Sequence, residues 1–190
     1  MKNFTEYFSG LNYAISKLNH ADLEEAYLIA RSCRNLYIFG NGGSAAIANH
    51  WVCDFMKGIN EDTIRKATAI SLNSNIDLIT AIANDIGYAQ VFSKQLEYMR
   101  PTPDDAVIAI SSSGNSKNIL NGLEKAMELK LTTIALTGFD GGRAAKLADC
   151  SVHVPVHNYG MVEDIHMMIL HAISQRIRSE TAKYPESIKL

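Results

Sequence analysis

The chain has 190 residues, of which 47 % are hydrophobic and 20 % charged, and these values are typical of one soluble globular domain. A net charge of −2 without any basic cluster argues against a protein that grips the phosphates of a nucleic acid. No apolar run approaches the roughly 20 residues that span a bilayer, no signal peptide is visible, and the three cysteines form no CxxC pair. We therefore expect a cytoplasmic protein that binds neither nucleic acid nor membrane.

Helices are expected first, over about residues 1–33, because apolar residues recur at helical spacing in Leu23–Ser32. Five short apolar runs, most of them rich in Ile, Val or Thr, are predicted to be buried strands: Leu36–Phe39, Thr68–Leu72, Ala106–Ile110, Thr132–Leu136 and Ser151–Val154. Helices are predicted between and after them: Ala45–Met56, Asp77–Ala83, Tyr88–Met99, Asn118–Leu129 and Met161–Arg178. A loose polar tail is expected after about residue 178.

This alternation predicts a single α/β domain over residues 1–190, with a five-stranded, mostly parallel sheet between two layers of helices. In such folds ligands bind at the carboxyl ends of the strands, near the point where the strand order reverses. The loops that follow the strands are therefore the segments in which to look for chemistry.

The first predicted strand runs into a glycine-rich loop, GNGGSAA at residues 40–46, and a helix is predicted to follow. Its three glycines let the backbone turn sharply and approach a ligand, and the helix start offers unpaired N–H groups. Asn41, Gly42 and Ser44 are therefore candidate substrate-binding residues. A tight turn in which Ser44 caps the helix explains the same residues, so both interpretations remain open.

The third predicted strand ends in a serine-rich loop, SSSGNS at residues 111–116. Ser111, Ser112, Ser113 and Ser116 bring four hydroxyl groups to one strand-to-helix turn, which suits a phosphate monoester and requires no metal ion. A polar turn that caps its own helix accounts for one of these serines but poorly for four. The loop is therefore predicted to bind phosphate.

Four side chains on two predicted helices combine the donors of a metal site with the groups of acid–base catalysis. His50 and Asp54 are four residues apart, and Glu163 and His171 are eight apart, so each pair shares roughly one helix face. Two histidines and two carboxylates can bind Zn²⁺ or another divalent ion. The same groups can instead act as general acids and bases, or form ordinary surface and core contacts.

Together these motifs resemble the SIS (sugar isomerase) domain, and their order is similar to that of the phosphoheptose isomerase family. The resemblance runs unbroken from about residue 36 to residue 171. It rests on five segments: GNGGSAA at 40–46 followed by His50, TAIAND at 80–85, YAQVF at 88–92 leading to Gln95, ISSSGNS at 110–116 and ALTGFDGGR at 135–143.

The resemblance implies aldose–ketose isomerisation of sedoheptulose 7-phosphate to D-glycero-D-manno-heptose 7-phosphate, through an enediol(ate), for lipopolysaccharide, capsule or other heptose-containing glycans. It implies that the serine loop holds the phosphate, that Asp54 is the catalytic base and that His171 is its acid–base partner. We further expect Asn84 and Asp85 to bind sugar hydroxyls. The family also implies a homotetramer with active sites where subunits meet. Each subunit is expected to hold one divalent ion, most simply Zn²⁺, on four ligands: His50, Asp54, Glu163 and His171. Of these, Glu163 is also expected to bind substrate.

The chain departs from the family pattern at two of these positions. Asp54 stands where the family usually has Glu, and Glu163 stands where it usually has Gln, while an Arg that follows in the family is missing near Lys57 and Gly58. The added carboxylate should favour a cation, and the shorter base should move the proton contact. These departures predict a distinct subfamily.

Two other classes of function are alternatives to an enzyme. One branch of the family is a non-catalytic binding factor for a replication initiator protein, but that branch lacks acid–base residues at the positions of Asp54 and His171. A sugar-phosphate-sensing regulator would require a DNA-binding helix pair or a basic stripe, and the sequence has neither. The presence of both acid–base residues favours an enzyme.

Overall fold

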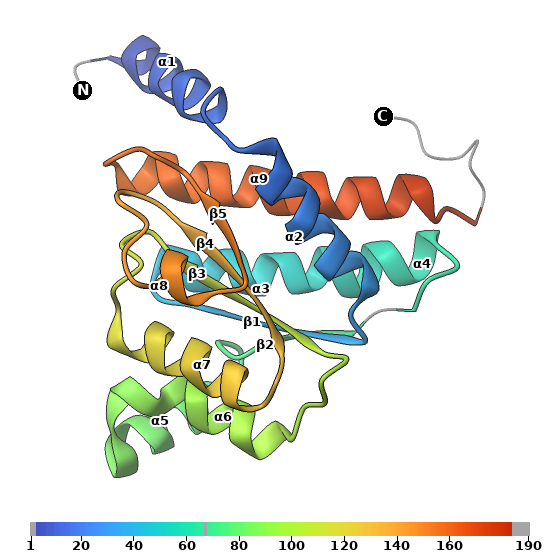
Figure 1. Ribbon diagram of the computed structural model, residues 1–190, viewed down its shortest axis with the longest axis vertical. Coiled ribbons are helices and arrows are strands. Elements are labelled where there is room, and N and C mark those ends of the chain that lie inside the picture. Colours follow the sequence, from blue (N-terminus) through green and yellow to red (C-terminus); the bar gives the residue numbers. More distant parts are fainter. Residues whose placement is uncertain (1–2, 67, 184–190) are drawn as a thin grey trace.

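The computed structural model describes residues 3–66 and 68–183, and its centre is a five-stranded sheet in the order β2-β1-β3-β4-β5 (Figure 1). Each pair of neighbouring strands is parallel. The strands are β1 (Asn35–Gly40), β2 (Thr68–Ser71), β3 (Ala106–Ser111), β4 (Thr132–Thr137) and β5 (Cys150–His153). The predicted α/β fold is confirmed, and the sheet is parallel throughout rather than mostly so.

Helices cover both faces of the sheet, as Figure 1 shows. One face carries α2 (His20–Ser32), α3 (Gly43–Cys53) and α9 (Tyr159–Glu180), which pack around the buried Trp51 and Phe55. The other face carries α5 (Ile76–Ile82), α6 (Val91–Met99) and α7 (Lys117–Glu128), where Phe39 stacks on Phe92 with ring centroids 4.7 Å apart. The helix α1 (Phe4–Ile15) extends beyond this body, and α4 (Asn60–Asp62) and α8 (Ala144–Leu147) are short.

The strand order decides where the two candidate loops meet. Although β2 separates them in sequence, β1 and β3 are neighbours in the sheet, and the chain builds outward from them in opposite directions. The glycine loop follows β1 and the serine loop follows β3, so both lie at the carboxyl edge where the order reverses. The fold therefore brings both phosphate-type loops to one place.

The helix starts differ in how their free N–H groups are satisfied. Asparagine side chains accept hydrogen bonds at the starts of four helices: Asn3 in α1, Asn19 in α2, Asn75 in α5 and Asn158 in α9. The two helices that start at the candidate loops have no side-chain cap of this kind. Because the N-cap of α3 is Gly42, at φ +55°, the alternative in which Ser44 caps this helix is wrong.

The carboxyl ends of two helices differ from their predicted positions in ways that bear on the site and the tail. The predicted helix Ala45–Met56 gives way to a π-helix over Asp54–Ile59, a geometry that is common at functional sites. At the other end of the chain α9 continues to Glu180, and Ala182 pairs with Thr63, so the first residues of the predicted tail are ordered. The rest of that tail, residues 184–190, lies outside the described residues.

None of the helices in the described part of the chain combines the length and apolar character that a bilayer-spanning segment needs.

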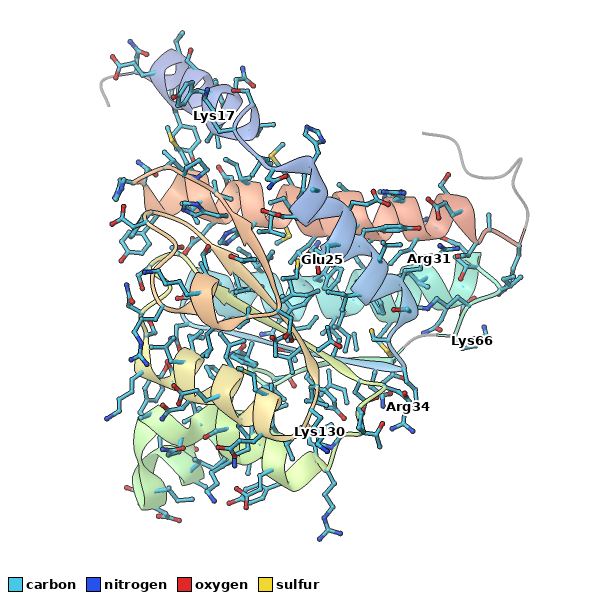
Figure 2. The ribbon with its side chains drawn as sticks, viewed as in Figure 1. Lys17, Glu25, Arg31, Arg34, Lys66 and Lys130 are labelled. Atoms are coloured by element: carbon cyan, nitrogen blue, oxygen red, sulfur yellow. The ribbon has the colours of Figure 1, made fainter. Side chains whose placement is uncertain are left out.

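In Figure 2, the labelled Arg34 and Lys66 project near the amino-terminal edge of the sheet, opposite the two candidate loops.

Candidate functional site

A cavity of about 300 Å³ lies between the glycine loop and the serine loop. It brings together most of the residues predicted to bind substrate: Asn41, Gly42, Ser44, Ser111, Ser112, Ser113, Ser116 and Glu163. Gly43, Ile110 and Tyr159 complete its lining. Among these lining residues, all of them in the described part of the chain, there is no Lys or Arg. Any anion held here must therefore be bound by N–H and hydroxyl groups.

The serine loop is held in shape by its own hydrogen bonds. The Gly114 N–H donates to the Ser111 carbonyl oxygen at 3.1 Å and lies 3.2 Å from the Ser111 Oγ, and the Asn115 N–H donates to the Ser113 Oγ at 3.3 Å. Ser116 is the N-cap of α7 but makes no side-chain capping bond. The simple alternative, a turn whose serine caps its own helix, therefore does not describe Ser116.

A neighbouring loop, residues 138–144, supports the serine loop from outside the cavity. The Gly138 N–H donates to the Ser112 carbonyl at 3.0 Å, and the Ala144 N–H donates to the Gly114 carbonyl at 2.9 Å. The two loops approach so closely that a Cβ on Gly114, which has φ +62°, would lie 2.0 Å from the Gly141 carbonyl oxygen. This support explains physically why a glycine-rich segment follows β4.

The glycine loop is tied to the start of α7 by a polar bridge that the sequence did not predict. The Asn41 and Asn118 amides exchange hydrogen bonds of 2.9 and 2.8 Å, and the Tyr88 hydroxyl donates to the Asn41 Oδ1 at 2.9 Å. Asn118 is buried, and only Lys117 separates it from Ser116 at the end of the serine loop. The one available signal was a polar residue on the buried face of α7, directly after the serines.

Glu163 lies against the glycine loop. A Cβ built on Gly43 would be only 2.2 Å from the Glu163 Oε2, so the carboxylate fits there because residue 43 is glycine. This contact places the carboxylate at the uncapped start of α3, inside the cavity.

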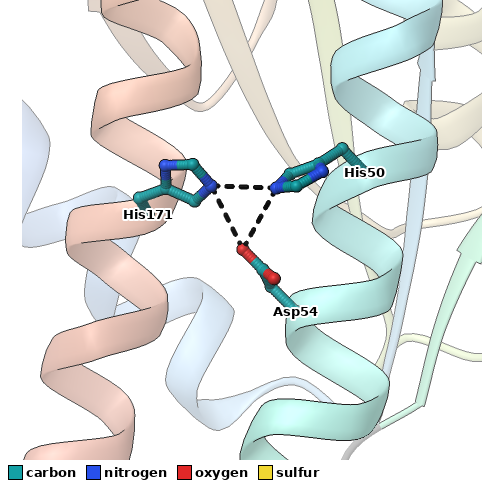
Figure 3. Close-up of side chains that lie close together, drawn as sticks. All are labelled: His50, Asp54 and His171. Atoms are coloured by element: carbon teal, nitrogen blue, oxygen red, sulfur yellow. Dashed lines mark hydrogen bonds and ion pairs between the residues drawn. The ribbon is translucent and has the colours of Figure 1, made fainter.

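His50, Asp54 and His171 form a compact triad on the facing sides of α3 with its π-helical extension and α9 (Figure 3). The Nε2 atoms of the two histidines are 3.0 Å apart, so one ring donates to the other. The Asp54 Oδ2 is 3.2 Å from the His171 Nε2 and 3.6 Å from the His50 Nε2. The side chains are 50 % exposed for His50, 45 % for His171 and 34 % for Asp54, so the triad is open to solvent.

The triad fits a divalent metal ion by the chemistry of its donors. One ligand atom from each residue lies within 4.8 Å of the others, and two imidazoles with one carboxylate are a donor set that zinc accepts. Glu163, the fourth predicted ligand, is not in this group, because eight residues of helix separate it from His171, a rise of about 12 Å. The structure thus brings three of the four predicted ligands together.

Asn84 and Asp85 lie apart from both regions. They are exposed, and the Asn84 Nδ2 donates to the Asp85 Oδ1 at 2.8 Å. Neither lines the cavity. The structure of one chain therefore does not bring these two predicted residues to the site.

His166 lies on α9 between Glu163 and His171, and it is fully buried. Its Nε2 is 3.1 Å from the Thr137 carbonyl oxygen at the end of β4. Burial in an apolar environment lowers the pKa of His166 to about 4, so the ring is neutral at pH 7. This contact anchors α9 to the sheet between the cavity and the triad.

Comparisons with known proteins identify the family of the chain. Residues 3–138 match the SIS domain family. A phosphoheptose isomerase of Helicobacter pylori is 35 % identical over 184 residues, covering 95 % of this chain and 95 % of that protein, and one of Colwellia psychrerythraea is 36 % identical, covering 97 % and 95 %. The solved structure of phosphoheptose isomerase from Neisseria gonorrhoeae has a TM-score of 0.83 and 31 % identity, covering 93 % of this chain and 95 % of that chain.

Proposed function

Because the chain belongs to the SIS-domain family, within its phosphoheptose isomerase branch, we propose that it isomerises sedoheptulose 7-phosphate to D-glycero-D-manno-heptose 7-phosphate. The reaction moves a carbonyl group between the first two carbons of an open-chain sugar. It therefore needs one place that holds the phosphate and another place that moves protons. The cavity and the triad supply these two places.

The observation that carries this proposal is the spacing of the two places. Gly43 faces Glu163 at the cavity and His50 faces His171 in the triad, so α3 and α9 run side by side in the same direction. Seven or eight residues of helix correspond to about 10–12 Å. With C–C bonds near 1.5 Å, an extended seven-carbon chain with its phosphate spans roughly 10 Å. A phosphate in the cavity thus leaves the far end of the sugar at the triad.

The cavity binds the phosphate through hydroxyl and N–H groups. Ser113 and Ser116 present hydroxyls at the uncapped start of α7, where the helix dipole favours negative charge. Fixing the phosphate holds the reacting carbons in place, which is catalysis by proximity.

At the triad, the Asp54 carboxylate takes the proton from the carbon next to the carbonyl, and the electron pair moves into an enediolate. His171 donates and accepts protons at the carbonyl and hydroxyl oxygens of the substrate. Its Nε2 lies 3.2 Å from the Asp54 Oδ2, so the two residues can also exchange a proton with each other. Asp54 then returns the proton to the neighbouring carbon. No atom is gained or lost, as an isomerisation requires.

We propose that His50, Asp54 and His171 also hold one divalent ion per subunit, most simply Zn²⁺. Such an ion, when bound, polarises carbonyl and hydroxyl oxygens as a Lewis acid. The chain's own residues still orient the substrate and carry its protons.

A homotetramer is proposed from the apolar surface of the N-terminal helices. A groove of about 310 Å³ lies between α2 and α9, lined mostly by aliphatic side chains such as Leu18 and Ile169. On α1 the side chains of Phe4, Phe8 and Tyr13 are exposed. Association of copies would cover both surfaces and draw the half-exposed triad into a subunit junction. Light scattering over a dilution series, read with specific activity, tests this: a fully active monomer would contradict it.

We place the enzyme in the cytoplasm, where its three free cysteines would stay reduced, and assign its product to lipopolysaccharide, capsule or another heptose-containing glycan.

The decisive experiment incubates purified protein with sedoheptulose 7-phosphate and follows the products by NMR. We expect the heptose aldose to appear, and its C2 position to acquire deuterium in heavy water. A parallel sample with chelator, together with metal analysis, tests the ion. No product at any metal loading would contradict the proposed function, and full activity without bound metal would contradict only the ion.

A further inference from the structure

The cavity contains a carboxylate where an anionic ligand is expected to bind. Glu163 is the one acidic residue among the lining residues, all of which are in the described part of the chain, and no Lys or Arg faces it there. The lining therefore carries a formal negative charge, although the cavity is proposed to hold a phosphate. The positions of the Glu163 carboxylate and of the helix starts explain how both negative charges can fit.

Two of the helices that begin at the cavity offer uncapped N–H groups to a negative charge, whereas at the start of α9 the Asn158 side chain accepts a hydrogen bond from the Met161 N–H. The first is α3, whose N-cap Gly42 makes no side-chain bond, and the second is α7, whose N-cap Ser116 makes none either. Neither helix has an acidic residue in its first turn. By helix electrostatics alone, a phosphate could bind at either start.

Glu163 removes this ambiguity. Its carboxylate lies so close to Gly43 that a Cβ there would be 2.2 Å from Oε2 and 2.4 Å from Oε1. The start of α3 therefore already has a negative charge supplied by α9, whereas the start of α7 is surrounded by serines. A second anion is repelled from α3 and is free to bind at α7.

We infer that Glu163 is a specificity-determining residue, which makes the cavity accept one phosphate and reject a ligand with a second anionic group near that phosphate. The inference rests on the proposed function, since it takes the cavity to be the phosphate site. Glu163 accepts hydrogen bonds from neutral hydroxyls of the sugar, and it repels carboxylates and second phosphates. Sugar phosphates are thereby distinguished from phosphorylated sugar acids and bisphosphates.

Two small ligands that differ in one group test this directly. Glycerol 3-phosphate and 3-phosphoglycerate share the phosphate and the neighbouring hydroxyl, but the second has a carboxylate in place of a CH₂OH group. Their dissociation constants would be measured by calorimetry at constant pH and ionic strength. We expect the wild-type protein to bind glycerol 3-phosphate at least about tenfold more tightly, because like charges a few ångströms apart repel strongly in a partly buried site.

The variant Glu163→Gln keeps the size and the hydrogen-bonding oxygen but removes the charge. We expect the ratio of the two dissociation constants to fall to within about twofold of one, mainly through tighter binding of 3-phosphoglycerate. The matched control is Asp164→Asn, which removes the same charge one residue along α9. The Asp164 carboxylate faces Tyr7, whose hydroxyl donates to it at 2.5 Å, so it lies outside the cavity lining. In this control the ratio should stay at the wild-type value.

The outcomes separate the inference from the function beneath it. Equal binding of both ligands by the wild-type protein, or an unchanged ratio in Glu163→Gln, overturns the role of Glu163 and leaves the isomerase untouched. Binding of neither ligand by the wild-type protein overturns the phosphate cavity, and the inference falls with it. A ratio that collapses equally in Asp164→Asn shows a general charge effect and also overturns the inference.

Discussion

The cavity and the triad are built in opposite ways, although the same two helices reach both. The cavity is formed by turns whose backbone and amide groups are tied together, by the bonds of the serine loop and by the bridge between Asn41 and Asn118. The triad consists of three side chains that project from helices, with about a third to a half of each exposed. The proposed phosphate site is thus preorganised within one chain, whereas the proposed site of proton transfer is open to solvent.

This difference shows what each end still requires. A preorganised cavity loses little entropy when the phosphate binds, so its contribution appears as affinity. An open triad works in water, where electrostatic stabilisation of an enediolate is weak, and it gains strength when water is excluded. We therefore expect the substrate, a metal ion or a neighbouring subunit to cover the triad, and changes at the two ends to affect different kinetic constants.

The largest effect is expected from Asp54→Asn, which removes the carboxylate of the proposed base with almost no change in size. We expect kcat to fall by about 10²–10⁴-fold, the usual contribution of general base catalysis, with KM changed by less than about threefold. Steady-state kinetics measures both constants. Glu61→Gln, which neutralises an exposed carboxylate seven residues further along, should leave both unchanged. A rise in KM with unchanged kcat would instead assign Asp54 to binding.

The opposite pattern is expected at the serine loop. Ser113→Ala or Ser116→Ala would remove a proposed hydrogen bond to the charged phosphate. Such a bond is worth about 1.5–3 kcal/mol, so KM should rise by about 10–100-fold while kcat changes little. Ser9→Ala, on the exposed surface of α1, is the control. If KM is unchanged in both variants, the loop does not hold the phosphate and the contrast between the two ends is lost.

The sequence predicted the parts that depend on local pattern, and it missed those that depend on side-chain direction. Short apolar runs and glycine or serine turns follow from the chain itself, so the strands and both loops were predicted to within one or two residues. The separation of Glu163 from His171 was not predicted. A spacing of eight residues puts two side chains on one helix face, but it does not show that both reach the same point. Asn118 was missed because its partner, Asn41, is far away in sequence.

The pH dependence of the free energy of unfolding tests the burial of His166, the residue that anchors α9 to the sheet between the cavity and the triad. The His166 pKa is about 4 in the folded protein and near 6.5 when unfolded, so the unfolded state takes up the proton first as the pH falls. The contribution of this residue is full above about pH 6.5 and is lost between pH 6.5 and 4, at roughly 1.4 kcal/mol per pH unit. At pH 5 the loss should be about 2 kcal/mol.

Urea unfolding at pH 7 and pH 5, at one protein concentration, measures this loss. In His166→Gln, which has no ionisable ring at this position, the difference between the two pH values should shrink by most of that amount. His20→Gln, at an exposed position, should retain the wild-type difference. An identical pH dependence in His166→Gln would show that other groups govern acid stability.

The smallest effect is expected at the bridge between the loops, and it tests preorganisation itself. Asn118→Ala removes the amide that exchanges two hydrogen bonds with Asn41, at a position that contacts no proposed substrate atom. We expect KM to rise about threefold to tenfold with kcat nearly unchanged, because the glycine loop must then be ordered when substrate binds. Asn41→Ala should have a similar effect, and the double variant should be little worse than either single one, with a coupling of about 1 kcal/mol. Tyr88→Phe, which removes one donor and leaves the amide pair, should have the smallest effect of the set. Additive losses in the double variant would mean that each loop is ordered independently, and that the cavity is not preassembled by this bridge.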